Sequence, residues 1–476
     1  MTSLAPPVPV SLARDLAALR QTGYESRSVK QEIRANLIDR LRAGQPTFPG
    51  IVGFEETVGP QLERALLAGH DVVLLGERGQ GKTRLIRSLS ALLDEWTPVV
   101  EGCEINDDPT SPICARCRRL SSELGDDLPI TWRHRSERFG EKLATPDTSV
   151  GDLIGDVDPV KVAEGRSLGD HETIHYGLVP RTNRGIFAIN ELPDLAERIQ
   201  VALLNVLEER DIQVRGYKIQ LPLDVVMVAS ANPEDYTNRG RLITPLKDRF
   251  GSQIRTHYPL DVDTETEIIL QEADVPDVPG IEISVTAPMT EIIATFSQLA
   301  RQSPHINQRS GVSVRLSVSN YEVLVANALQ RALRSGASEA VPRICDLEAL
   351  PASTAGKVEI ETLEDGRDGQ IIDHLVRAAV LSVFRERVRP ETLLAVVEAF
   401  EGRDPVECGE DVPDATYVGL CEAMPPLAEV AHGLVGERSS AARVASAVEF
   451  VLEGLHLSKR LNKEAVGGRA QYRARG

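Results

Sequence analysis

The chain has 476 residues, 42% of them hydrophobic and 26% charged, a composition typical of a water-soluble globular protein of about three domains. With 53 basic and 71 acidic residues its formal net charge is −18, which argues against a broad basic surface for nucleic acid. No apolar run is long enough to span a membrane, residues 1–20 do not resemble a signal peptide, and the six cysteines do not suggest a disulfide framework. We therefore expect a cytoplasmic protein.

Residues 1–45 are predicted to form an N-terminal helical segment. Apolar residues at helical spacing predict two helices in residues 11–43, broken near Gly23. Proline and glycine punctuate residues 45–53, which mark the entry into the next domain, and residues 54–69 are predicted to form a further helix.

A glycine-rich loop follows the apolar run at residues 72–75 and opens a predicted helix. The loop matches the pattern G-x-x-x-x-G-K-[ST] in full, with the residues Gly76, Glu77, Arg78, Gly79, Gln80, Gly81, Lys82 and Thr83. Glycines let backbone N–H groups approach a phosphate, the lysine charge reaches the β and γ oxygens, and the threonine hydroxyl is a suitable ligand for Mg²⁺. The loop therefore predicts binding of ATP together with Mg²⁺.

Further apolar strands are predicted at residues 97–102, 185–191, 225–232 and 250–257, and residues 195–209 are predicted to form a helix between two of them. Alternating strands and helices indicate an α/β domain with a parallel sheet and a ligand at its carboxyl edge. Residues 103–178 are interpreted as an irregular insertion, because they are far too long for an ordinary connection. Residues 211–224 alternate as a hairpin does. We expect this domain to occupy residues 46–262.

Beyond residue 262 the pattern becomes mainly helical. The clearest helices are predicted at residues 289–301, 317–336, 369–387, 390–399 and 439–461. We divide this part into an all-helical lid domain, residues 263–400, and a helical C-terminal extension, residues 401–476. Residues 467–476 are a short basic tail that we expect to be disordered.

Polar residues end two of the predicted strands and are candidates for catalysis. Glu191 stands where a nucleotidase places the base that polarises the attacking water. Asn190, its neighbour, occupies the position where an aspartate is expected to hold the water shell of Mg²⁺, and its amide brings no charge. Asn232 ends the next strand, where it either orients the same water or caps the turn before Pro233.

Four motifs together resemble the AAA+ ATPases, in the branch that contains the I subunit of magnesium chelatase and the MoxR-type ATPases. They are residues 76–83, 185–191, 232–234 and 247–251, and the resemblance covers residues 48–333. It implies that Asn232 is a sensor residue, that Arg249 is an arginine finger for a neighbour's γ-phosphate, and that Arg315 is the sensor arginine of the lid. It also implies a homo-oligomeric ring, usually a hexamer, and a partner protein with a von Willebrand A domain.

The leading hypothesis is a ring ATPase, resembling magnesium chelatase subunit I, that couples ATP turnover to the remodelling of a protein partner. The alternative is a nucleotide-dependent scaffold with little hydrolysis, for which the missing charge of Asn190 is the evidence. An enhancer-type transcription activator would require a Gly-Ala-Phe-Thr-Gly-Ala loop, and residues 103–178 contain none.

Two groups of metal-ligating residue types lie in the insertion. Cys103, Cys114 and Cys117, with His134 as a candidate fourth ligand, are either a structural Zn²⁺ site or free thiols. Residues 171–175 spell H-E-x-x-H, but the glycines on either side leave too little helix for a zinc peptidase, and we interpret the segment as a solvated loop.

Overall fold

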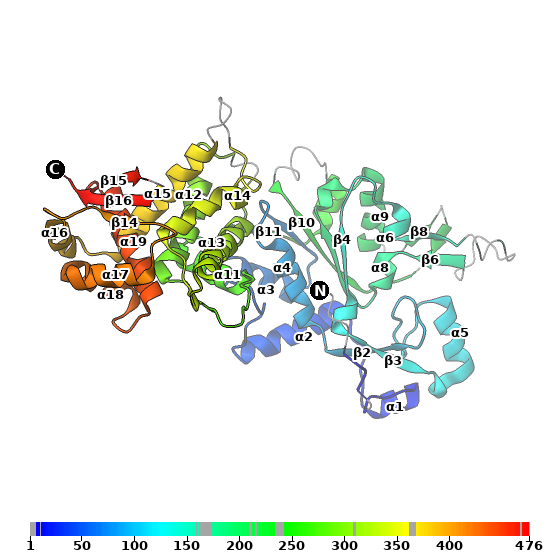
Figure 1. Ribbon diagram of the computed structural model, residues 1–476. Coiled ribbons are helices and arrows are strands. Elements are labelled where there is room, and N and C mark those ends of the chain that lie inside the picture. Colours follow the sequence, from blue (N-terminus) through cyan, green and yellow to red (C-terminus); the bar gives the residue numbers. More distant parts are fainter. Residues whose placement is uncertain are drawn as a thin grey trace. The chain divides into compact units, whose positions relative to one another are not determined.

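The computed structural model describes residues 6–9, 11–158, 160, 163, 173–208, 212–214, 217–219, 221–233, 242–307, 311–360, 368–466 and 469–475. The chain divides into two compact units, Met1–His257 and Tyr258–Gly476, which Figure 1 shows from blue to green and from green to red. Among the described residues, no helix combines the length and the apolar character that crossing a membrane requires.

A five-stranded sheet forms the centre of the first unit. Its strands are all parallel and lie in the order β11-β1-β10-β7-β4 (Figure 1). Their bounds are β1 Val72–Leu75, β4 Phe139–Leu143, β7 Gly185–Asn190, β10 Val225–Ala231 and β11 Ser252–Arg255. The predicted α/β fold with a parallel sheet is thus confirmed.

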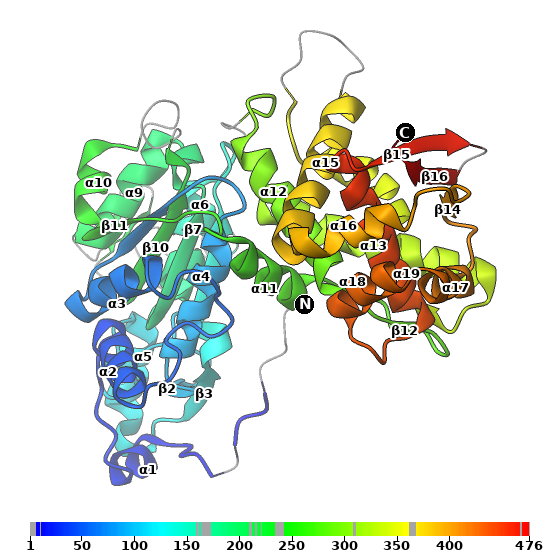
Figure 2. The ribbon, with the colours of Figure 1, turned by 90° about the vertical axis from the view of Figure 1, so that its left-hand side faces the viewer.

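Both faces of this sheet are buried, which explains why its central strands are continuous apolar runs. Alternate residues of β1 enter different cores: Val72 and Leu74 pack into one cluster, and Val73 and Leu75 into the other. Helices pack over the sheet: α2 Val29–Arg42 and α4 Lys82–Ser88 contact β10, and α3 Val58–Ala68 contacts β11 (Figure 2). The first helix of the unit is α1 Leu16–Gln21, so the predicted break near Gly23 is confirmed.

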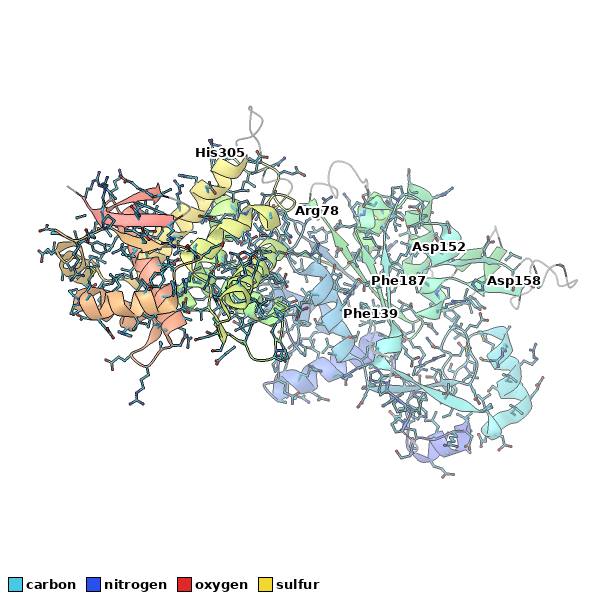
Figure 3. All side chains as sticks on the ribbon, viewed as in Figure 1. Arg78, Phe139, Asp152, Asp158, Phe187 and His305 are labelled. Atoms are coloured by element: carbon cyan, nitrogen blue, oxygen red, sulfur yellow. The ribbon has the colours of Figure 1, made fainter. Side chains whose placement is uncertain are left out.

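The segment predicted as an irregular insertion contains regular structure and completes the sheet. Strand β2, Trp96–Val100, does not join the main sheet as expected, because it pairs antiparallel with β3, Ile130–His134. The edge position is taken instead by β4, where Gly140 lies opposite Phe187 (Figure 3 labels Phe187 and the adjacent Phe139). An edge strand is only half buried, so its sequence lacks the apolar run by which the other strands were predicted.

Short elements fill the rest of this segment and the stretch after it. They are α5 Ala115–Leu124, α6 Val150–Leu153, β5 Gly155–Val157, β6 Ile174–Tyr176 and α8 Leu178–Arg181. His175 therefore lies in a strand, whereas His171 and Glu172 of the H-E-x-x-H pattern lie outside the described residues. After α9, Glu197–Glu208, the predicted hairpin is present as β8 Ile212–Val214 and β9 Tyr217–Ile219, and α10 Thr244–Arg249 precedes the last strand.

The second unit is mainly helical and is built around one large apolar core that runs from Ile269 to Tyr472. Its principal helices are α11 Val262–Glu272, α12 Ala287–Gln302, α13 Val314–Ser335, α14 Leu350–Thr354, α15 Asp368–Arg387, α16 Pro390–Glu398, α17 Asp414–Ala423, α18 Pro425–Val435 and α19 Ala441–Leu457. Two small sheets accompany them: β12 Glu282–Ile283 with β13 Glu339–Ala340, and a three-stranded sheet, β14-β16-β15.

The end of the chain differs from the prediction. Helix α19 ends at Leu457, because Lys459 adopts a left-handed conformation (φ 61°) and Arg460 N–H bonds back to Leu455 O at 2.8 Å. A glycine usually marks such a helix end, and a lysine gives no such signal. The following residues form β15 Leu461–Val466 and β16 Arg469–Ala474, which pairs with β14 Val406–Cys408. The expectation of a disordered basic tail was therefore wrong.

Candidate functional site

The phosphate loop connects β1 to α4, and its backbone needs glycine at specific points. A Cβ at Gly76 would overlap the side chains of Thr256 and Gln80, which are hydrogen-bonded to each other at 2.7 Å. Gly81 precedes α4 with φ 71°, a conformation that favours glycine. Arg78 is exposed at the turn of the loop (Figure 3). The loop thus has the open backbone that a phosphate requires.

Lys82 is buried at the start of α4, and its ammonium group points back into the loop. Its Nζ donates hydrogen bonds to Gly76 O, to Glu77 O at 2.9 Å and to Asn232 Oδ1 at 3.2 Å. Asn232 directly follows β10, the neighbour of β1 in the sheet. The lysine and the predicted sensor residue are therefore brought together at the carboxyl edge of the sheet, as ligand binding in a parallel sheet requires.

The predicted magnesium ligands also meet at this edge. The Thr83 hydroxyl donates to Asn190 Oδ1 at 3.4 Å, and the Ser230 hydroxyl donates to the same oxygen at 3.2 Å. The Asn190 side chain is buried, so its amide oxygen is held facing Thr83. A hydroxyl and an amide oxygen this close can share the water shell of one Mg²⁺ ion.

A carboxylate that belongs to none of the sequence motifs lies next to Asn190. Asn190 Nδ2 donates to Glu141 Oε1 at 2.6 Å, across the register between β7 and β4. Arg87 of α4 holds the same carboxylate with Nε at 2.7 Å from Oε2 and Nη2 at 3.1 Å from Oε1. Glu141 therefore orients the Asn190 amide and places a negative charge one side chain away from the position of the missing aspartate.

Glu191 follows β7 in an unusual backbone conformation. Its φ is 55°, in the left-handed region that a residue with a side chain seldom adopts, and its N–H donates to Ser230 Oγ at 3.2 Å. Ser230 thus contacts both members of the Asn190–Glu191 pair. Backbone strain of this kind concentrates at functional sites, and it supports Glu191 as the candidate for the catalytic base.

The two candidate arginines lie in different units. Arg249 is the last residue of α10, is exposed, and pairs with Glu208 at the end of α9. Arg315 belongs to the second unit, where it is exposed in the first turn of α13 and its N–H donates to the capping Ser313 Oγ at 3.1 Å. The roles of both arginines stay predictions.

The three candidate zinc ligands of the insertion come together, but His134 is not among them. The sulfur atoms of Cys103, Cys114 and Cys117 lie with a carboxylate oxygen of Asp107 in one buried group. His134 is partly exposed and its Nδ1 is hydrogen-bonded to Ser136 Oγ at 2.8 Å. The fourth member is Asp107, a residue type that the spacing of cysteines and histidines does not indicate.

Comparison with known proteins finds one matching family model and several magnesium-chelatase subunits that are similar in sequence. Residues 164–250 match the family model of the Sigma-54 interaction domain. The chain is 32% identical over 235 residues to the magnesium-chelatase 38 kDa subunit of Cereibacter sphaeroides, covering 47% of this chain and 62% of that protein. It is 29% identical over 236 residues to magnesium-chelatase subunit ChlI of Nostoc sp., covering 48% and 58%. The chain thus spans less than two thirds of the length of these relatives.

A solved structure of the complex between the BchI and BchD subunits of magnesium chelatase contains a chain that is 21% identical to this one. The match covers 68% of this chain and 98% of the other. Its TM-score is 0.35, which is too low to establish a shared arrangement of the whole chain. The similarity to magnesium-chelatase subunits rests on the sequence relatives and on the motifs at the sheet edge. Together they confirm that the chain resembles the AAA+ ATPases and, within them, the I subunit of magnesium chelatase.

Proposed function

We propose that this protein is a ring-forming ATPase that binds ATP with Mg²⁺, hydrolyses it and uses the turnover to remodel a protein partner. The observation that supports this most directly is the convergence of Lys82, Thr83, Asn190 and Asn232 at the carboxyl edge of one sheet. In this proposal Lys82 binds the β- and γ-phosphates, and Thr83 with Asn190 holds the water shell of Mg²⁺, which would supply charge neutralisation at the phosphates. Glu191 polarises the attacking water.

The ring and its partner form the finer part of the proposal. The resemblance to the magnesium-chelatase I subunit supports a homo-oligomer, for which a hexamer is expected, with Arg249 completing a neighbour's site. The same resemblance suggests a partner with a von Willebrand A domain. Coupling requires that such a partner bind the ATP state and the ADP state with different affinities.

The test of the proposed function is the variant Lys82→Ala. Loss of the loop cation should abolish binding of a labelled ATP analogue, ATPase activity and ATP-dependent capture of the partner, while the protein stays folded. Lys357→Ala is the matched control, because this exposed lysine of the second unit donates to Ser353 O and has no role in the proposed site. Unchanged ATP affinity in Lys82→Ala would contradict the assignment of the loop, and equal capture with ATP and ADP would contradict coupling.

A scaffold that binds ATP and barely hydrolyses it is the second candidate, and the neutral side chain of Asn190 favours it. The two candidates differ in a single measurement on the unaltered protein. A scaffold should bind ATP with Mg²⁺ and release no phosphate over many minutes, even when rings have formed. Sustained phosphate release that Glu191→Gln abolishes, with ATP still bound, would exclude the scaffold.

A further inference from the structure

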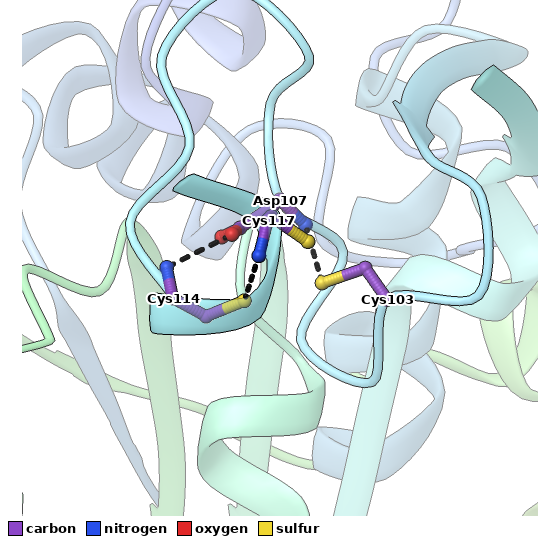
Figure 4. Close-up of side chains that lie close together, drawn as sticks. All are labelled: Cys103, Asp107, Cys114 and Cys117. Carbon is purple, nitrogen blue, oxygen red and sulfur yellow. Dashed lines mark hydrogen bonds between the residues drawn. The ribbon is translucent and has the colours of Figure 1, made fainter. Parts of the chain in front are cut away.

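Four side chains from the loop after β2 and from the first turn of α5 form a compact group, which we name the Cys3Asp cluster (Figure 4). Its members are Cys103, Asp107, Cys114 and Cys117. Each offers one ligand atom, all four residues are buried, and the four atoms lie within 4.8 Å of one another. Cys114 caps the N-terminus of α5, and Cys117 lies in its first turn.

Asp107 is the member that a packed core does not explain. It is fully buried, and its Oδ2 accepts hydrogen bonds from Ile113 N at 3.2 Å and Cys114 N at 2.9 Å. Its Oδ1 is buried without a hydrogen-bond partner in the part of the chain that the structure describes. A buried carboxylate oxygen left without a partner costs free energy, and native proteins avoid it unless a ligand satisfies the group.

Each of the three sulfur atoms faces one hydrogen-bond donor. Asp107 N–H donates to Cys103 Sγ at 3.4 Å, Cys117 N–H donates to Cys114 Sγ at 3.3 Å, and Arg116 Nη1 lies 3.9 Å from Cys117 Sγ. The first of these bonds closes a loop in which Asn106 is in the left-handed region (φ 54°). N–H groups directed at the sulfur atoms fix their orientation, as hydrogen bonds around metal ligands do.

We propose that the Cys3Asp cluster binds one structural Zn²⁺ ion. Tetrahedral zinc with Zn–S bonds of about 2.3 Å requires sulfur atoms about 3.8 Å apart, which small side-chain movements from the present arrangement would give. Three soft sulfur ligands exclude Mg²⁺ and Ca²⁺, which take oxygen ligands. Four protein ligands leave no open position for a reacting water, so the site is structural and distinct from the ATPase site.

The position of the cluster shows what the ion would stabilise. Asn106 Nδ2 donates to Arg181 O at 2.8 Å, and Asn183 Nδ2 donates to Ile105 O at 3.0 Å. These bonds join the loop between β2 and α5 to the residues just before β7, the strand that carries Asn190 and leads to Glu191. The ion would hold the loop closed and thereby support the start of that strand.

The first experiment measures metal on the full chain, purified without chelator. Elemental analysis should find one zinc ion per chain that survives dialysis and is released when a mercurial reagent blocks the thiols. Protein refolded with Co²⁺ should show the thiolate charge-transfer band and the strong visible bands of tetrahedral cobalt. Folded protein that contains no zinc, and takes up neither Zn²⁺ nor Co²⁺ when offered, would overturn the proposal.

Variants then assign the ligands. Cys114→Ser and Asp107→Asn should lose zinc, whereas Cys421→Ser, a buried cysteine of the second unit, should keep it. If either cluster variant fails to fold, cobalt spectra of the unaltered chain still decide the question. Full zinc content in folded Cys114→Ser, or a Cys114–Cys117 disulfide found by mass spectrometry of the native protein, would argue against the site. Because the readouts are metal content and spectra, the result is independent of whether the chain hydrolyses ATP.

Discussion

Asp107 in the first unit and Asp346 in the second are both completely buried, yet their oxygens are occupied very differently. Asp346 Oδ1 accepts from Asn327 Nδ2 at 3.0 Å, and its Oδ2 accepts from Arg331 Nη2 at 2.9 Å and Arg343 N at 2.7 Å. Asp107 uses only Oδ2 among the described residues. A buried carboxylate whose two oxygens both accept hydrogen bonds stabilises the packing of helices. One whose second oxygen has no donor is available for a ligand.

The same contrast extends beyond these two aspartates. In the second unit Glu449 is buried, which raises the pKa of its carboxyl, and it accepts a hydrogen bond from the Tyr417 hydroxyl at 2.5 Å. At the sheet edge of the first unit, the bonds of Thr83 and Ser230 to Asn190 are long, at 3.4 and 3.2 Å. Hydrogen bonds as long as these two leave the Thr83 and Ser230 hydroxyls able to exchange partners, as the proposed nucleotide site requires, whereas the short Tyr417–Glu449 bond stabilises the fold.

The largest effect is expected for Arg249, because its ion pair with Glu208 is exposed and so contributes little stability. As a finger acting on a neighbour, it could contribute roughly 10³-fold in turnover. Arg249→Ala should bind ATP nearly normally and turn over slowly, and mixing it with Lys82→Ala should restore activity, since the second variant still supplies the finger. The measurement is ATPase rate across mixing ratios. Mixed rings as inactive as either parent would leave Arg249 as a surface ion-pair residue only.

Arg331→Ala tests Asp346, the buried carboxylate whose two oxygens both accept hydrogen bonds. The change leaves Asp346 buried with part of its partners removed, and breaking a buried ion pair costs about 3–5 kcal/mol. We expect a large fall in melting temperature of the second unit with no change in zinc content or ATP affinity. The exposed Arg334 of the same helix, changed to alanine, should leave the melting temperature nearly unaltered. Equal, small effects of the two variants would refute a structural role for the pair.

The smallest effect is expected from substitutions of Glu141 and Asn190, which test how the charge at the sheet edge influences Mg²⁺ binding. Asn190→Asp would place a carboxylate where the amide now donates to Glu141 at 2.6 Å, and repulsion between the charges should prevent any gain in Mg²⁺ binding. The double variant Asn190→Asp/Glu141→Gln keeps one charge and moves it next to Thr83. It should lower the Mg²⁺ concentration for half-maximal ATPase by roughly three- to tenfold.

The matching control is Glu137→Gln, because Glu137 pairs with Arg133 away from the site. A magnesium titration in which the single and double variants behave alike would show that Glu141 does not influence the site. The control should titrate as the unaltered chain does.

The parts of the structure that could be predicted are those encoded in contiguous residues. The phosphate loop, the buried strands β1, β7 and β10, and most long helices follow from local patterns, because burial on both faces of a sheet or one face of a helix repeats along the chain. Lys82, Thr83 and Asn190 lie at the sheet edge as the motifs indicated. The mutual position of these residues follows from parallel pairing alone.

The parts that could not be predicted depend on contacts between distant residues. Glu141 reaches Asn190 only through the pairing of β4 with β7, and no spacing in the sequence reports that register. Asp107 is a candidate ligand because the fold places its Oδ1, which has no hydrogen-bond partner among the described residues, beside three sulfur atoms. The strands after α19 were missed because a left-handed lysine, Lys459, ends the helix without the usual glycine.

Strand β4 also determines how far the chain can be shortened. Residues 103–178 resemble a removable loop in the linear sequence, but β4 covers one side of β7 along its length. A chain spliced across this segment would expose the unpaired N–H and C=O groups of an apolar strand, and such an open edge attracts strands of other molecules. This segment is therefore an architectural part of the sheet, because its strand β4 pairs with the backbone edge of β7.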